Sequence, residues 1–286
     1  MISLSLLKFP PKDTKVFDRP HVEKAAHTGR VKIALLRDDS IRYVTRCVLA
    51  GMYLSIVVFV YWSLINDLGA TPYGKLLGSM FFGVGLAMIV LTNTELFTSN
   101  NLYLAISCYE GTTTWRSAGA LWGVCYIGNL LGAVIIASLL YATGIIDDLP
   151  ANHALYVGAL HKAHEAAAVI FWRGVLANWL VCLAVRLALR CHEEIAKIVI
   201  LILVVFMFLY LGGEHSIANM ATFSVALIGK SSLSLGGAMY NELFATLGNV
   251  VGGVLFIAIP FAYINPPAPI EMPQPAPATD PNRGHE

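Results

Sequence analysis

The sequence predicts an all-α membrane protein of six transmembrane helices, arranged as two inverted repeats of three helices each. Three observations lead to this fold class. First, 57% of the 286 residues are hydrophobic and only 13% are charged, whereas a soluble domain carries about 25% charged residues. Second, the apolar residues gather in runs long enough to cross a bilayer. Third, the two halves of the chain repeat the same order of motifs.

Six runs with few or no charged residues mark the expected spans. About 20 apolar residues in a helix are needed to cross roughly 30 Å of hydrocarbon, and each run reaches that length. Only Glu95 and Arg173 interrupt the second and fourth runs, and Glu214 with His215 interrupts the fifth. The six runs cover residues 47–66, 76–109, 117–146, 166–185, 198–229 and 243–264.

The second and fifth runs are too long for one helix each. They have 34 and 32 residues, and at about 1.5 Å per residue a helix of the longer run reaches roughly 50 Å. Both runs also carry polar residues near their middle, in "TELFTSNN" (94–101) and "GGEHSIANM" (212–220). Irregular backbone at such depth is tolerated only where protein buries it or where it lines a cavity. Each run is therefore predicted to be two half-helices joined by a loop, whose N-terminal dipole ends suit an anion.

The repeat supports this interpretation. "RCVLAGMYL" (46–54) resembles "RGVLANWLV" (173–181), and a break with an acidic residue follows in each half. A G-N-x-x-G motif comes next: Asn129 lies 34 residues after Glu95, and Asn249 lies 35 residues after Glu214. Three spans per repeat is an odd number, so the two copies must have opposite topology. We expect the glycines of the two motifs to let helices pack closely.

Basic residues predict the orientation and the domain limits. Ten of the 19 lysines and arginines lie in residues 1–46, so the positive-inside bias places both termini in the cytoplasm, in a multi-pass protein of the inner membrane. Residues 20–40 are expected to form an amphipathic helix. The chain divides into a cytoplasmic segment (1–41), a transmembrane channel domain (42–264) and a Pro-rich tail (265–286). Arg46 and Arg173, at matching places in the repeats, are expected to form a structural ion pair or an interface anchor.

Composition and motifs exclude other classes of protein. The net charge is +1 and the basic residues form no continuous stripe, so no nucleic-acid partner is predicted. The five cysteines show no C-x-x-C spacing, so no metal site or cofactor is predicted. An enzyme is not predicted either, because Glu214-His215 has no second histidine four residues on. A cation transporter needs more converging carboxylates or histidines. A water or small neutral-solute channel is the alternative, although the twin Asn-Pro-Ala turns of aquaporins are absent.

"TELFTSNN", "HKAH" (161–164), "LANWLVCLAV" (176–185), "GEHSIANM" and the paired G-N-x-x-G motifs closely resemble the formate/nitrite transporter family over residues 20–264. "LANWLVCLAV" is nearest to the nitrite branch of that family. The resemblance implies a homopentamer in which each protomer has its own pore and an aquaporin-like fold. It also implies passage of small monovalent anions of weak acids: nitrite, formate, hydrosulfide, acetate or lactate.

The resemblance also assigns roles to individual residues. His215 is the central histidine and Thr98 the pore-loop threonine of the substrate and proton path. The remaining assignments are a cytoplasmic-side constriction of Phe82 with Leu86, near Phe97; an outer constriction of Val181 with Phe208; vestibule lysines Lys162 (outer) and Lys32 (inner); and loop supports Glu95, Glu214, Asn178 and Asn219. The chain departs from the family at Gly213, where relatives carry Phe or Tyr, and at Asn93-Thr94.

These residues suggest a mechanism. A lysine at the mouth raises the local anion concentration, and apolar rings reject a charged ion that loses its water there. We hypothesise that Thr98 and His215 bind the anion at the centre, where it receives a proton and crosses the next ring as the neutral acid. An ionisable residue inside a span indicates function by default, and histidine suits this step because its ordinary pKa is near neutrality.

Overall fold

The computed structural model describes residues 18–69 and 71–267, and these residues are helical with short connections and no strands. The helices are α1 (Arg19–Asp38), α2 (Ser40–Asp67), α3 (Tyr73–Leu91), α4 (Phe97–Tyr109), α5 (Trp115–Ala142), α6 (Ala154–His164), α7 (Ala167–Arg190), α8 (Glu194–Tyr210), α9 (Ser216–Ile228), α10 (Leu235–Gly253), the π-helical η2 (Val254–Ala258) and α11 (Ile259–Tyr263). The all-α membrane class is confirmed. Residues 1–17 and most of the predicted tail, residues 268–286, lie outside the described residues.

Both predicted breaks are present in the structure. The second apolar run is split between α3 and α4, and the fifth between α8 and α9. Within the part of the chain that the structure describes, five helical stretches are long and apolar enough to cross a membrane alone: α2, α3, α5, α7 and the continuous stretch from Leu235 to Tyr263. Helices α8 and α9, with 17 and 13 residues, are each shorter than the roughly 20 residues that one span needs. The count of six spans therefore stays a prediction.

The two breaks use the same backbone turn. Asn93 and Gly212 have positive φ angles of 53° and 77°, a conformation that glycine adopts freely and asparagine tolerates better than other residues. The next residue then points its N–H back into the ended helix: Thr94 donates to Ile89 O at 3.1 Å, and Gly213 donates to Phe208 O at 2.8 Å. An asparagine thus ends the helix in one half where a glycine ends it in the other.

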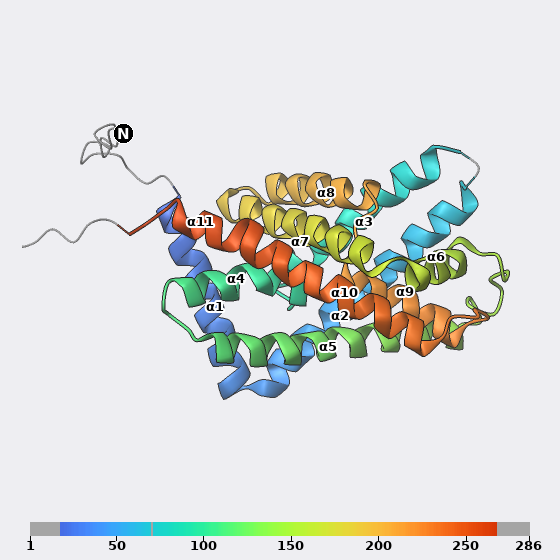
Figure 1. Cartoon of the computed structure of the whole chain (residues 1–286), viewed down its shortest axis with the longest axis horizontal. Helices are drawn as coiled ribbons and strands as arrows, with labels where there is room; N and C mark the ends of the chain where they lie inside the picture. Colours follow the sequence, from blue (N-terminus) through green and yellow to red (C-terminus); the bar gives the residue numbers. More distant parts are fainter. Residues whose placement is uncertain (1–17, 70, 268–286) are drawn as a thin grey trace, which may run out of the picture.

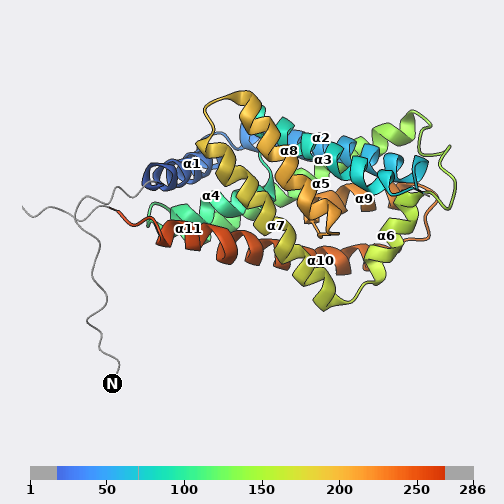
Figure 2. The same ribbon diagram turned by 90° about the horizontal axis from the view of Figure 1, so that it is seen from above.

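The half-helices enter the molecule from opposite ends. Figures 1 and 2 show α4 at the end of the long axis that also holds α1 and α11, whereas α9 lies toward the end that holds α6. The first and last described residues lie together at the α1 end. This arrangement is that of two inverted repeats.

Glycines allow the long helices of each repeat to touch. A Cβ atom on Gly132 of α5 would collide with the carbonyl oxygen of Val48 in α2, and one on Gly252 of α10 would collide with that of Val175 in α7. The expected close packing at the two G-N-x-x-G motifs is therefore confirmed, and it places the asparagine of each motif against the broken loop of its own repeat.

Helix α1 confirms the helix expected over 20–40. Its buried residues Val22, Ala25, Ala26 and Gly29 form one face, at the spacing of an amphipathic helix. Gly29 packs against α4, since a Cβ there would lie 2.6 Å from the carbonyl oxygen of Tyr103. The start of α1 is held by ion pairs, among them one of 2.6 Å between Arg19 Nη2 and Glu110 Oε2.

Candidate functional site

Two polar side chains meet where the half-helices converge. Thr98 lies in the first turn of α4, and His215 is the N-cap residue of α9. Their atoms Oγ1 and Nε2 are 2.9 Å apart, although the residues are 117 positions apart in the chain. Both side chains are buried. The structure thus brings together the two residues predicted for the substrate and proton path.

The hydrogen bonds of His215 assign its protons. The backbone N–H of Ala218 donates to Nδ1 at 3.1 Å, so Nδ1 must carry a lone pair. In the neutral ring the proton is then on Nε2, and Nε2–H donates to the Thr98 oxygen. The hydroxyl hydrogen of Thr98 is therefore free to donate to a third group. The ring of Phe208 stacks on the imidazole, with centroids 5.9 Å apart.

Asn129 holds the first loop. Its Oδ1 accepts from the N–H of Phe97 at 2.9 Å, which satisfies a free donor at the start of α4. Its Nδ2 donates to the carbonyl oxygens of Cys47 at 2.8 Å and Glu95 at 2.9 Å. One buried amide therefore joins α5, α2, the loop and the half-helix.

Asn249 holds the second loop in the same way. Its Oδ1 accepts from the N–H of Ser216 at 2.9 Å, and its Nδ2 donates to the carbonyl oxygens of Gly174 at 2.9 Å and Glu214 at 2.8 Å. Sequence reasoning assigned the two Gly-Asn motifs to helix packing alone and missed this role. The nearly equal sequence separations of the asparagines from the loop glutamates, 34 and 35 residues, were the signal that could have revealed it.

Glu95 carries the charge of the first loop. It is 2% exposed, and its Oε2 accepts from Lys32 Nζ of α1 at 2.6 Å and from Asn100 Nδ2 at 3.0 Å. Its backbone N–H donates to the carbonyl of Arg46 at 3.2 Å. Asn100 was not predicted, although it follows Glu95 by five residues as Asn219 follows Glu214.

Glu214 has matching partners in the second loop. It is 3% exposed and accepts from Lys162 Nζ of α6 at 2.8 Å and from Asn219 Nδ2 at 2.6 Å. Its N–H donates to the carbonyl of Arg173 at 3.2 Å. Buried carboxylates need such partners, so each predicted vestibule lysine neutralises a loop glutamate and is not a free cation. Asn178, also predicted as a support, donates to the carbonyl of Asn249 at 2.6 Å.

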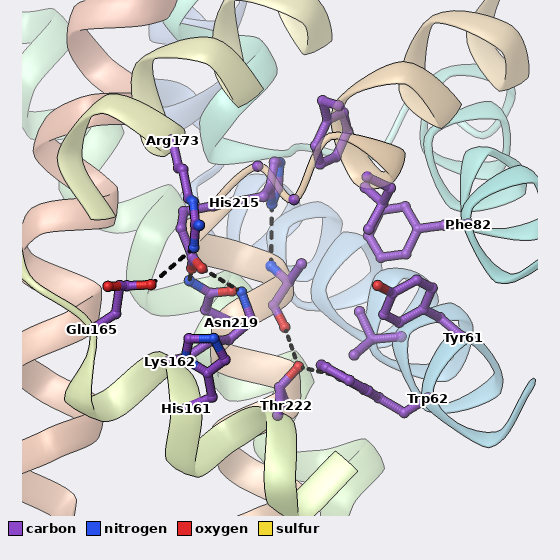
Figure 3. A pocket seen from close by; sticks show the side chains of 18 residues that line it. Tyr61, Trp62, Phe82, His161, Lys162, Glu165, Arg173, His215, Asn219 and Thr222 are labelled. Carbon is purple, nitrogen blue, oxygen red and sulfur yellow. Dashed lines mark hydrogen bonds and ion pairs between the residues drawn. The ribbon is translucent and has the colours of Figure 1, made fainter. Parts of the chain in front are cut away.

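A pocket opens on each side of the Thr98–His215 contact. The Lys162 pocket, of about 190 Å³, includes Lys162, Arg173, Glu165, Glu214, His161 and His215 among its lining residues, and the Lys32 pocket, of about 750 Å³, includes Lys24, Lys32, Arg46, Lys197, Glu95 and Glu194. Figure 3 shows Arg173, Glu165 and Lys162 on one side of the Lys162 pocket and Tyr61, Trp62 and Phe82 on the opposite side. The pocket therefore has a charged wall and an aromatic wall.

The aromatic residues are grouped differently from the prediction. Phe82 was expected with Leu86 on the cytoplasmic side, but its ring packs edge-to-face on Phe208 at 6.0 Å, and both line the Lys162 pocket. One helical turn separates Phe82 from Leu86, about 5.4 Å along the axis, which is enough to put them at different depths. Leu86, Phe97 and Val181 are buried and line neither pocket.

Comparisons with known proteins show which family the sequence is similar to. The family model for formate/nitrite transporters matches residues 19–263. The nitrite transporter NirC of Salmonella typhimurium is 32% identical over 266 residues, which are 90% of this chain and 96% of NirC.

Two solved structures share the fold. A structure described as an FNT family ion channel superposes with a TM-score of 0.82 at 31% identity, covering 86% of this chain and 99% of that one. A pentameric formate channel with formate bound superposes with a TM-score of 0.69 at 27% identity, covering 79% of this chain and 97% of that one.

Proposed function

Because the chain belongs to the formate/nitrite transporter family, a family of membrane transporters and channels and not of enzymes, we propose that it conducts formate and nitrite across the membrane. The observation that carries the proposal is the contact of Thr98 with His215 between the two pockets, at the N-termini of two half-helices. Hydrosulfide, acetate and lactate share the charge and small size of these anions and are included in the proposed substrate class.

The centre of the molecule suits a small anion. The helix dipoles of α4 and α9 both put positive potential there, and the Thr98 hydroxyl has a hydrogen to donate. On the way from the Lys162 pocket, the paired rings of Phe82 and Phe208 cannot replace the water that a charged ion loses. The centre therefore stabilises the charge of the anion, whereas the rings do not. A neutral acid loses less hydration energy than an anion and passes the rings more easily.

We propose that transport is proton-linked through His215. The Thr98 hydroxyl gives its proton to the anion, and Thr98 takes the proton of His215 Nε2. His215 stays neutral because Nδ1 takes a proton from a hydronium ion that enters the pocket from bulk water and is left as a water molecule, a step that requires the hydrogen bond from Ala218 to open. The imidazole thus changes tautomer, and the anion leaves as the uncharged acid.

Uptake by proteoliposomes tests this proposal. We expect His215→Asn to lose most formate flux and the wild-type dependence of flux on pH. His161→Asn is the matched control, since His161 lines the same pocket but lies outside the central contact. Wild-type flux with a wild-type pH profile in His215→Asn contradicts the proton linkage.

Competition among anions defines the substrate. We expect nitrite and formate to inhibit each other's uptake. Hydrosulfide, acetate and lactate are tested as competitors in the same assay. A water or neutral-solute channel predicts glycerol-driven swelling without formate uptake, and this result favours the alternative function.

Assembly and location complete the proposal. We propose a homopentamer in which residues 42–264 form the channel unit, as in the solved relative described as pentameric. The Lys32 pocket and both termini then face the cytoplasm across the inner membrane, because the basic N-terminal segment lies at that end. Native mass spectrometry measures the assembly, and protease access to terminal tags in sealed vesicles measures the orientation.

A further inference from the structure

Two arginines occupy equivalent places at the two pockets. The carbonyl oxygen of Arg46 accepts a hydrogen bond from the N–H of Glu95, and that of Arg173 accepts one from the N–H of Glu214, both at 3.2 Å. Arg46 is a lining residue of the Lys32 pocket, and Arg173 is a lining residue of the Lys162 pocket, where Figure 3 shows its side chain. The sequence suggested a structural ion pair or an interface anchor for both. Arg173 does form an ion pair, with Glu165, and both arginines also border a pocket.

The ion pairs of the neighbouring lysines leave Arg173 at the Lys162 pocket, and Arg46 together with Lys24 at the Lys32 pocket, as cations available to an anion. Lys32 and Lys162 are held by Glu95 at 2.6 Å and by Glu214 at 2.8 Å. At such distances the charges of a pair largely cancel for a solute that approaches from the pocket. A guanidinium, by contrast, offers several planar donors that match the two oxygens of a carboxylate or of nitrite.

The two arginines differ in their partners. Arg173 Nη1 lies 3.1 Å from Glu165 Oε2, and the side chains are 42% and 20% exposed. An ion pair this accessible to water contributes little stability and can exchange partners. Arg46, which is half-buried, makes no ion pair with any residue in 18–69 or 71–267.

We propose that Arg46 and Arg173 capture the transported anion at the two mouths, and that Glu165 competes with the anion for Arg173. The inference rests on the proposed function, anion transport through this pore. A carboxylate or nitrite ion arriving at the Lys162 pocket must displace Glu165, whereas one arriving at the Lys32 pocket meets a guanidinium without that competitor. The channel therefore binds its substrate more weakly from the Lys162 side.

Sided transport measures this difference. Formate is supplied on one face of proteoliposomes whose protein orientation is read from protease access to a terminal tag, and initial rates give the half-saturating concentration. We expect Arg173→Gln to raise the half-saturating formate concentration about threefold, and only when formate is supplied from the Lys162 side. This is the effect expected from the loss of one charge at roughly 6 Å from the anion in water. Arg46→Gln does the same from the Lys32 side. Maximal rates change little, since the central residues are intact.

Glu165→Gln provides the sharper test because it leaves both arginines in place. We expect it to lower the half-saturating formate concentration from the Lys162 side about threefold, because it removes a negative charge and also frees Arg173. The effect is expected to be clearly smaller when it is combined with Arg173→Gln, where only the direct effect of the removed charge remains. Arg173→Lys keeps the charge and is expected to retain part of the capture. Lys230→Gln is the control, because Lys230 is a basic residue at the same end that lies outside the pocket lining.

The outcomes separate this inference from the proposed function. If wild-type protein carries no formate or nitrite, the proposed function fails. If wild-type protein conducts, but Arg173→Gln and Glu165→Gln keep wild-type half-saturation from both sides, the capture role is wrong. An effect of Glu165→Gln that is equally large in the presence of Arg173→Gln also overturns it. Should Arg173→Gln not assemble, Arg173→Lys and Glu165→Gln decide the question.

Discussion

The two broken loops share their scaffold but not their chemistry. In each loop an asparagine from the last helix of the repeat accepts from the first N–H of the half-helix and donates to the carbonyl of the loop glutamate. By that correspondence His215 matches Leu96, the N-cap residue of α4. Thr98, three residues after Glu95, matches Ile217. The two residues that touch at the centre are therefore not equivalent, and the site is asymmetric within a duplicated frame.

The mouths differ in the same manner. Each has a loop glutamate paired with a lysine, but the Lys32 pocket has four basic and two acidic lining residues, whereas the Lys162 pocket pairs Lys162 and Arg173 with two glutamates. Duplication thus accounts for what holds the loops in place, whereas the central contact is formed by residues that each occur in one half only. Changes to shared residues should have equal effects in both halves, and changes to unshared ones should not.

The largest effect is expected from the two asparagines. Asn129→Ala and Asn249→Ala each leave one buried N–H without its acceptor and remove one donor from two buried carbonyls, for a loss of about 3–5 kcal/mol in the free energy of unfolding. Thermal unfolding of the detergent-solubilised protein measures it. Asn66→Ala, at an exposed asparagine bonded to Ala154, should cost less than about 1 kcal/mol. A large loss in only one of the two variants contradicts the shared scaffold.

The two lysines come next. Lys32→Met and Lys162→Met each leave a loop glutamate nearly buried without its cation, at a cost of about 2 kcal/mol, since pocket water reaches both lysines. The double variant Lys162→Met/Glu214→Gln removes the stranded charge and should recover part of the thermal stability. If Lys162→Met unfolds at the wild-type temperature, the lysine serves attraction at the mouth and not compensation of Glu214.

What the sequence could and could not predict follows from the range of each interaction. The breaks at Glu95 and Glu214 were predictable because polar groups inside an apolar run must be buried in protein or line a cavity. The contact of Thr98 with His215 was predictable only as a shared path, from family resemblance. The three hydrogen bonds of Asn129 depend on how α2 and α5 approach each other, and the depth of Phe82 depends on one helical turn. The depth of Phe82 has no signature in a single sequence, and the role of Asn129 leaves only the matched spacing of the two asparagines from the loop glutamates.

A smaller effect is expected at Gly213, where the two loops differ in side-chain volume. A Cβ there would lie 3.0 Å from both Ala177 Cβ and Phe208 O, whereas the matching residue Thr94 already carries a side chain. We expect Gly213→Ala to cost about 1 kcal/mol and to disturb the stacking of Phe208 on His215. Thermal unfolding and formate flux measure the two effects. Thr94→Ala should leave flux unchanged, and equal loss of flux in both variants contradicts the asymmetry.

The smallest effect is expected where an asparagine and a glycine perform the same turn. At Gly212 a Cβ meets no atom within 4 Å, so only its positive φ opposes a side chain, and asparagine tolerates that conformation. Gly212→Asn and Asn93→Gly should each change the free energy of unfolding by less than about 0.5 kcal/mol. Gly212→Val, with a β-branched side chain at the same φ, should cost clearly more. Thermal unfolding of the three variants shows whether the turns at 93 and 212 accept the same residues or whether position 212 requires glycine. A loss in Gly212→Asn as large as in Gly212→Val indicates that the second loop needs glycine for a reason that the first does not share.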